Sequence, residues 1–194
     1  ALPVDFGAAY THLRALSDSL SVMPANGTFN FQWGGLYLSG DCSSDLQVFN
    51  LDGGQVLSAH TFQVDCVPAD AHVVINISGS APGLTNMSLS SLSQHRERVV
   101  FNFFEASSLT LSGIGVEGSI LAPDAVIDNP QGVIYGQLVS RSWNGQMQLN
   151  HHVFQTRGGD SGGGNIAPVA NDVDERASVA APTPLQLLAT DADG

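Results

Sequence analysis

A short repeat in the second half of the chain constrains the fold more than any other feature of the sequence. Residues 116–122 (VEGSILA) recur eighteen positions later as residues 134–140 (IYGQLVS), with an aliphatic residue, a glycine and two further aliphatic residues in common. Short β-prone runs repeated at a fixed period are typical of a β-solenoid, because one coil has an apolar edge that only a stacked neighbour can bury. The alternative is a β-sandwich whose strands happen to match.

The segments around this repeat predict a mainly-β domain with one long helix packed alongside. A helix is predicted over residues 5–23, because apolar side chains recur three and four positions apart. Asp5 is a possible N-cap, and Pro24 ends the pattern. From residue 28 to residue 154, short runs rich in Val, Ile, Leu and Phe alternate with Gly, Asp, Asn or Pro breaks. The helix is therefore expected to lay its apolar stripe on a face of the solenoid.

The charge balance excludes several classes of partner. The chain of 194 residues has a formal net charge of −12, and its six basic residues are all arginine. Nucleic-acid binding and docking on an anionic membrane both need a basic patch, so neither is expected. No run of apolar residues reaches the length of a membrane-spanning helix.

The two cysteines, Cys42 and Cys66, lie in neighbouring strand-like segments. Residues about one coil apart can be side by side in a solenoid, so a disulfide is geometrically plausible, and it would indicate an oxidising compartment. In the chain-entropy model, closing a loop of this length contributes about 3 kcal/mol to stability. Two buried free thiols are the alternative.

The composition changes after Phe154, which predicts three parts. Residues 1–157 are expected to form the β-domain, residues 158–165 (GGDSGGGN) a Gly-rich linker, and residues 166–194 the truncated start of another module.

Several segments of the first part are similar to one known family. They are PVDFGAAYTHLRALSDSL, MPANGT, LQVFNLDG, AHVVINISG, GVIYGQLVS and, most specifically, FNFFEASSLTLSGIGVEGSILAPDA at residues 101–125. Together they resemble the choice-of-anchor A family, a bacterial surface module also described as an ice-binding-like or collagen-binding-like adhesive domain. The resemblance covers residues 1–154, and it implies a right-handed β-solenoid with a helix alongside and an adhesive function.

The last part resembles the start of a cadherin-like or Ig-like tandem repeat of a large bacterial adhesin, through the segments NIAPVANDVDE and PLQLLATDADG. Such repeats often bind Ca²⁺ at their junctions, and carboxylates spaced as Asp-x-Asp supply the oxygen ligands that Ca²⁺ needs. The resemblance implies that four aspartates take this role: Asp172, Asp174, Asp191 and Asp193. The alternative is a solvated acidic stretch.

Aromatic and basic residues near the repeat are the candidates for ligand binding. Aromatic side chains exposed on a β-surface commonly stack on sugars or anchor protein ligands. Trp143, beside Arg141 in a loop-like setting, is preferred to Trp33, and Tyr135 of the repeat is a further candidate. Buried packing of Trp143 is the alternative interpretation.

The sequence does not favour an enzyme. Glu105 and Glu117 could in principle form an acid–base pair, but Tyr135 replaces Glu117 in the next copy of the repeat. His151 and His152 are adjacent, and adjacent residues of a strand point to opposite faces. Thr-x-Thr ranks, which would favour ice binding, do not occur in the sequence.

We therefore expect a bacterial adhesin module that is secreted or displayed on the cell surface. It would bind a glycan, a matrix protein or another surface, and it would act as a monomer within a longer multidomain chain. A polysaccharide-acting enzyme, an ice-binding protein and a structural envelope spacer remain the alternatives.

Overall fold

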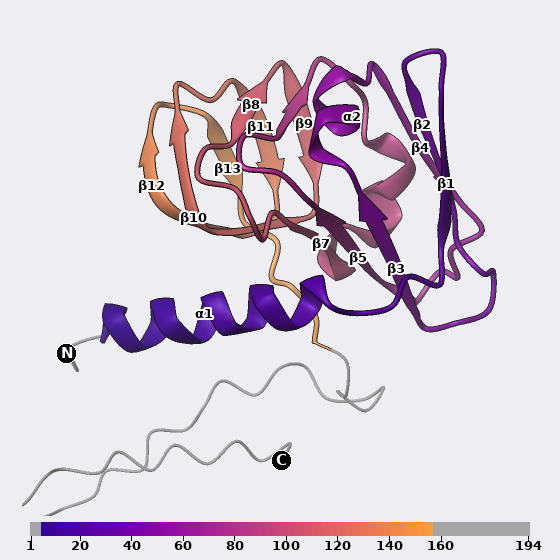
Figure 1. Cartoon of the computed structure of the whole chain (residues 1–194), viewed down its shortest axis with the longest axis horizontal. Helices are drawn as coiled ribbons and strands as arrows, with labels where there is room; N and C mark the ends of the chain where they lie inside the picture. Colours follow the sequence, from indigo (N-terminus) through magenta and orange to yellow (C-terminus); the bar gives the residue numbers. More distant parts are fainter. Residues whose placement is uncertain (1–4, 157–194) are drawn as a thin grey trace, which may run out of the picture. The chain divides into compact units, whose positions relative to one another are not determined.

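The computed structural model describes residues 5–156 (Figure 1). It has one helix of several turns, α1 (Phe6–Ser21), and two shorter ones, α2 (Gly53–Ser58) and the 3-10 helix η1 (Ser90–Arg98). The strands are β1 (Thr28–Gln32), β2 (Gly35–Ser39), β3 (Leu46–Leu51), β4 (Thr61–Asp65), β5 (His72–Ile77), β6 (Gly83–Thr85), β7 (Val99–Asn102), β8 (Thr110–Ser112), β9 (Ile114–Glu117), β10 (Ser119–Asp128), β11 (Gly132–Tyr135), β12 (Leu138–Asn144) and β13 (Gln148–Asn150).

The described strands form four sheets, with the orders β1-β2-β4, β12-β10-β7-β5-β3, β13-β11-β9 and β6-β8. The two copies of the repeat lie on paired parallel strands. Ile134 pairs with Val116 and Leu138 pairs with Ile120, in parallel, so equivalent residues of the two copies lie side by side.

The predicted fold class, a right-handed β-solenoid with one long helix, is wrong. The strands are distributed over several parallel and mixed sheets, β1 and β2 form an antiparallel hairpin, and α1 has only 16 residues. The eighteen-residue spacing holds only near the end of the domain. In the five-stranded sheet Asn50 of β3 pairs with Asn76 of β5, twenty-six positions on, because α2 and β4 lie between these strands. Two matching segments therefore do not define one uniform coil.

The five-stranded sheet has an apolar layer on each face. Phe101 of β7 faces the larger core, whereas its neighbour Val100 faces a smaller cluster with Val48, Val74 and Leu121. Leu13 and Leu20 of α1 pack on that smaller cluster, as does Met23, which follows the helix. Since successive residues of a strand point to opposite faces, nearly continuous apolar runs such as Val73–Ile77 are required here.

Three asparagines in register attach α1 to the sheet. The Nδ2 of Asn102 donates to Asn76 Oδ1 at 2.8 Å and to the Ser17 carbonyl at 2.9 Å. The Nδ2 of Asn76 donates in turn to Asn50 Oδ1 at 2.9 Å and to the Leu20 carbonyl at 2.8 Å. The ladder satisfies buried amides and adds a second donor to the Leu20 carbonyl in the last turn of α1, which also accepts from the amide of Met23 at 3.2 Å.

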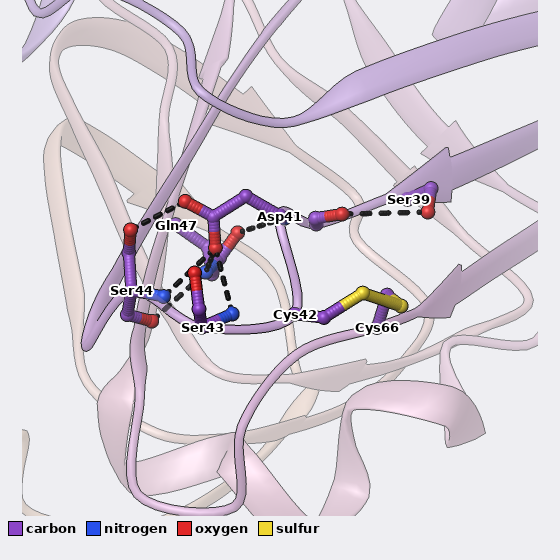
Figure 2. Close-up of a disulfide and its surroundings, with 8 residues drawn as sticks. Ser39, Asp41, Cys42, Ser43, Ser44, Gln47 and Cys66 are labelled. Atoms are coloured by element: carbon purple, nitrogen blue, oxygen red, sulfur yellow. Dashed lines mark hydrogen bonds between the residues drawn. A yellow bond between two sulfur atoms is a disulfide. The ribbon is translucent and has the colours of Figure 1, made fainter.

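The predicted disulfide between Cys42 and Cys66 is confirmed, with the two Cα atoms 4.4 Å apart (Figure 2). It joins the segments that follow β2 and β4, where the amide of Cys42 also donates to the carbonyl of Cys66. Beside it, Asp41 accepts hydrogen bonds from the Gln47 side chain and from the amides of Ser43 and Ser44. These bonds, with that of Gln47 the largest cause, hold the pKa of Asp41 well below its usual range.

Candidate ligand-binding face

The tip of the β1–β2 hairpin presents an indole to solvent. Gln32 pairs with Gly35, so Trp33 and Gly34 form a two-residue turn, and both have positive φ, 51° and 74°. Positive φ at both central residues matches the right-handed twist of a hairpin, and Asn-Gly is the usual pair at these positions. The Trp33 side chain is 85% exposed.

The outer face of the sheet β1-β2-β4 lies next to this tip. In this sheet Leu36 and Leu38 of β2 are buried in the core, so Tyr37 between them points outward and is 42% exposed. The register places Asn30 of β1 and Gln63 of β4 on either side of it. We call this surface the Tyr37 face, made up of Thr28, Asn30, Gln32, Gly35, Tyr37, Ser39, Thr61, Gln63 and Asp65.

A glycine lets the Tyr37 ring lie along the sheet. A Cβ atom added at Gly35 would be 2.7 Å from Tyr37 Cε2 and 2.9 Å from its Cζ and Oη, closer than side-chain contacts allow. The ring therefore covers the backbone of Gly35, two residues earlier on the same strand. One side of the ring is against the sheet, and the exposed fraction belongs to the remainder.

The polar groups of the Tyr37 face are nearly all uncharged. Asn30 Nδ2 donates to Gln32 Oε1 at 2.9 Å, which fixes two amide groups side by side on β1. Asp65 is the one ionisable carboxylate in the set, and the set contains no arginine or histidine. An aromatic ring surrounded by amides and hydroxyls can bind a ligand by stacking and hydrogen bonding rather than by ion pairing.

The predicted site residues lie on two other sheets. Trp143, on β12, is half-buried against the main core, and its Nε1 donates to the Gly145 carbonyl at 3.2 Å. Arg141 is exposed on the same strand. Tyr135 lies on β11, in the sheet β13-β11-β9, so the structure does not bring it onto the sheet that carries Trp143 and Arg141.

Tyr135 belongs to a compact polar cluster. The guanidinium carbon of Arg96 lies 4.8 Å from the centre of its ring, and an Arg96 nitrogen lies 2.7 Å from Glu117 Oε2. The ring of His152 approaches Tyr135 edge-on, with the ring centres 6.3 Å apart. Cation–π and ion-pair contacts of this kind join η1, β9, β11 and the segment after β13, which is a structural role.

A comparison with family models identifies the domain. Residues 1–151 match the model of the family named Putative Ice-binding-like adhesive domain. The chain belongs to this family. No curated protein matches the chain, and neither does any solved structure.

A hollow in the adhesive domain lies near the C-terminal end of α1, but its polar groups already have partners. The pocket has a volume of about 400 Å³ and includes Phe29, Phe104, Asn76 and Asp52 in its lining. Asn76 is engaged in the asparagine ladder, and the side chain of Asp52 caps α2 through the amide of Gln55. The Tyr37 face offers more accessible polar groups to a ligand.

Metal binding by the adhesive domain finds no support within residues 5–156, where no three His, Cys, Asp or Glu side chains are grouped to hold an ion. The proposed Ca²⁺ ligands lie outside the described residues, as do the predicted linker and the module after it: Asp172, Asp174, Asp191 and Asp193. Among the described helices, none has the length and apolar character needed to cross a membrane.

Sequence reasoning weighed Trp33 and passed over Tyr37. A usable signal was present, because Trp33-Gly34-Gly35 separates two β-prone runs and so marks a hairpin tip, where side chains are exposed. For Tyr37 the alternation of Leu36, Tyr37 and Leu38 predicts an outward ring. The contact of the Tyr37 ring with Gly35 also follows from the sequence, because residues two positions apart on a strand lie on the same face.

Proposed function

We propose that this domain is the ligand-binding module of a bacterial adhesin, attaching the cell to a glycan, a matrix protein or another surface through Trp33 and the Tyr37 face. The observation that carries the proposal is the conformation and exposure of Trp33, with φ of 51° and an exposed fraction of 85%. Its family, an ice-binding-like adhesive domain, supports binding to an external ligand.

Tryptophan at position 33 is energetically unfavourable in the isolated domain. A non-glycine residue in the left-handed region costs about 1–2 kcal/mol, and asparagine bears this conformation better than tryptophan. The indole also remains in water although tryptophan is among the residues that contribute most when buried at an interface. Backbone strain of this kind is commonly found at functional sites, and a partner that covers the indole accounts for both costs.

The proposed location is extracellular or on the cell surface. The disulfide between Cys42 and Cys66 is of a kind that persists in oxidising compartments. A net charge of −12 favours solubility there and disfavours attachment to nucleic acid. We further propose that the domain is a choice-of-anchor A module, followed by an Ig-like or cadherin-like repeat that binds Ca²⁺.

The proposal includes no catalysis. Glu105 Oε2 accepts from the amide of Gly79 at 2.7 Å, and Glu117 is paired with Arg96. The two carboxylates that a polysaccharide-cleaving enzyme would require thus have separate structural partners, which supports binding without turnover.

The variant Trp33→Asn tests the proposal. We expect binding in a screen of immobilised glycans and matrix proteins to fall at least tenfold, because a buried indole is a typical interface hot spot. The same substitution should raise the melting temperature by about 2–4 °C, because asparagine relieves about 1 kcal/mol of backbone strain.

The matched control is Phe6→Ala, which removes an aromatic side chain that is 80% exposed on α1, away from the hairpin. It should leave binding unchanged. If Trp33→Asn binds every surface as well as the wild type does, the role of Trp33 is refuted. If the wild type itself binds no glycan, matrix protein or other surface, the adhesive function is refuted.

A further inference from the structure

We infer that the Tyr37 face binds a neutral saccharide, with the Tyr37 ring as the platform for the apolar face of a sugar. This inference rests on the proposed adhesive function and names the class of ligand. Three observations support it: the position of the Tyr37 ring over Gly35, the register that places amides beside the ring, and the charge of the surface.

The ring of Tyr37 is oriented by the sheet before any ligand arrives. A side chain of any size at Gly35 would collide with Cε2, Cζ and Oη of the ring, so the glycine creates the space in which the ring lies along the strand. One side of the ring is thereby covered and the side chain is still 42% exposed. A flat aromatic surface that already lies along the strand suits the C–H groups on one face of a pyranose, because binding then requires little reorganisation of the protein.

Hydrogen-bonding groups flank the ring on both neighbouring strands. Asn30 is directly opposite Tyr37 on β1, and Gln63 is opposite it on β4. Paired strands lie about 4.8 Å apart, so amides on both sides are within reach of the hydroxyls of one stacked sugar. The hydrogen bond from Asn30 Nδ2 to Gln32 Oε1 orients this pair, and Asn30 Oδ1 and Gln32 Nε2 have no partner among the described residues.

The charge of the surface selects against acidic ligands. The Tyr37 face contains no basic residue, and Asp65 on its margin is negative. The chain as a whole carries −12, so sulfated, sialylated or phosphorylated glycans meet repulsion and find no basic side chain among the residues of the Tyr37 face. A ligand whose hydroxyls are uncharged matches the amides and hydroxyls that are present.

The test is a titration of the full chain with neutral hexose and N-acetylhexosamine oligosaccharides, and with sulfated and sialylated ones. Neutral oligosaccharides should bind and acidic ones should not. Tyr37→Ala should weaken binding at least tenfold, whereas Tyr37→Phe should stay within threefold, because the ring and not the hydroxyl forms the platform. Gly35→Ala should weaken binding as Tyr37→Ala does, because the new methyl group displaces the ring.

Tyr10→Ala is the matched control, since Tyr10 is 37% exposed on α1, and it should bind as the wild type does. Melting temperatures establish that each variant is folded. Binding to acidic glycans or to a matrix protein, unaffected by Tyr37→Ala and Gly35→Ala, would overturn this inference and leave the adhesive function standing. Absence of binding to any surface would instead remove the proposed function.

Discussion

The asparagine ladder shows how single residues attach a helix to a sheet. Asn102 is fully buried and Asn76 is 1% exposed. Asn76 accepts from Asn102 and donates to Asn50, and Asn102 Oδ1 accepts from the Ser17 hydroxyl. An amide buried without partners would cost several kcal/mol, so such residues are stable only when every group is paired. Here the helix supplies carbonyl acceptors at Ser17 and Leu20, and so the ladder and α1 require one another.

We predict that Asn76→Ala lowers the free energy of unfolding by about 2–4 kcal/mol, because Asn102 Nδ2 loses its acceptor on Asn76 and Asn50 Oδ1 loses its donor. Urea denaturation monitored by circular dichroism measures this. Asn30→Ala is the matched control, since Asn30 is exposed, and its effect should stay within about 0.5 kcal/mol. Equal effects of the two substitutions would contradict the role of the ladder.

A glycine of the repeat shows a different constraint. A Cβ atom added at Gly136 would be 2.2 Å from the Gly118 carbonyl oxygen, so the backbones of the two copies are in direct contact at this point. The glycine shared by the two copies is thus required by the close approach of neighbouring segments.

Among the elements, β3 is an edge strand whose free groups are covered by a side chain. Asn26 accepts from the amide of Val48 at 2.7 Å and donates to the Leu46 carbonyl at 2.9 Å, and the amide of Gly27 donates to the Val48 carbonyl. An exposed edge strand invites pairing with other chains. The segment between α1 and β1 prevents this at β3.

The disulfide stabilises the junction between β2 and β4. Its cysteines are 24 positions apart, and that loop contains β3, α2 and β4. We predict that reduction lowers the free energy of unfolding by about 3 kcal/mol, mainly because the unfolded chain gains freedom. Urea midpoints measured with and without a reductant check this.

The control for the reductant is the double variant Cys42→Ser, Cys66→Ser. Its midpoint should match that of the reduced wild type and should not respond to reductant. A wild-type midpoint that is insensitive to full reduction would contradict the prediction.

For the molecule as a whole, His95 and Asp41 are expected to make the free energy of unfolding depend on pH in the acidic range. Burial, and next the nearby Arg98, lower the pKa of His95. The unfolded chain therefore takes up this proton first, and stability falls as the pH drops below about 6.5. The pKa of Asp41 is lowered in the folded state, so its contribution is present above about pH 3.9 and is lost as the pH falls towards the folded pKa.

We predict that the difference in unfolding free energy between the wild type and Asp41→Asn shrinks as the pH falls below about 4, because the wild type then loses the contribution of its carboxylate. His95→Gln should instead reduce the decline between pH 7 and pH 5.5. Urea titrations at a series of pH values measure both. A difference between the wild type and Asp41→Asn that is constant from pH 6 to pH 3 would contradict the assignment to Asp41.

Features that depend on neighbours in the sequence were predictable. Asp5 caps α1 by accepting from the amide of Ala8, and the spacing of 116–122 and 134–140 is a parallel register. The pairing of Cys42 with Cys66 was favoured because they lie in neighbouring strand-like segments about one solenoid coil apart, and the disulfide is present although the solenoid is not. The fold class was not predictable, because a period that is read from two copies says nothing about the lengths of the segments between earlier strands.

The sequence by itself determined that the two copies of the repeat pair in parallel, that a capped helix precedes the strands and that basic charge is scarce, and it favoured the disulfide. These properties follow from residue spacing and side-chain chemistry, which act locally. The tertiary structure alone decided that the strands of residues 5–156 separate into four sheets, that Trp143 packs on the core while Trp33 remains in solvent, and that three asparagines meet under a helix. Burial depends on contacts between segments that are distant in the chain, so only the packed molecule specifies which side chains a ligand can reach.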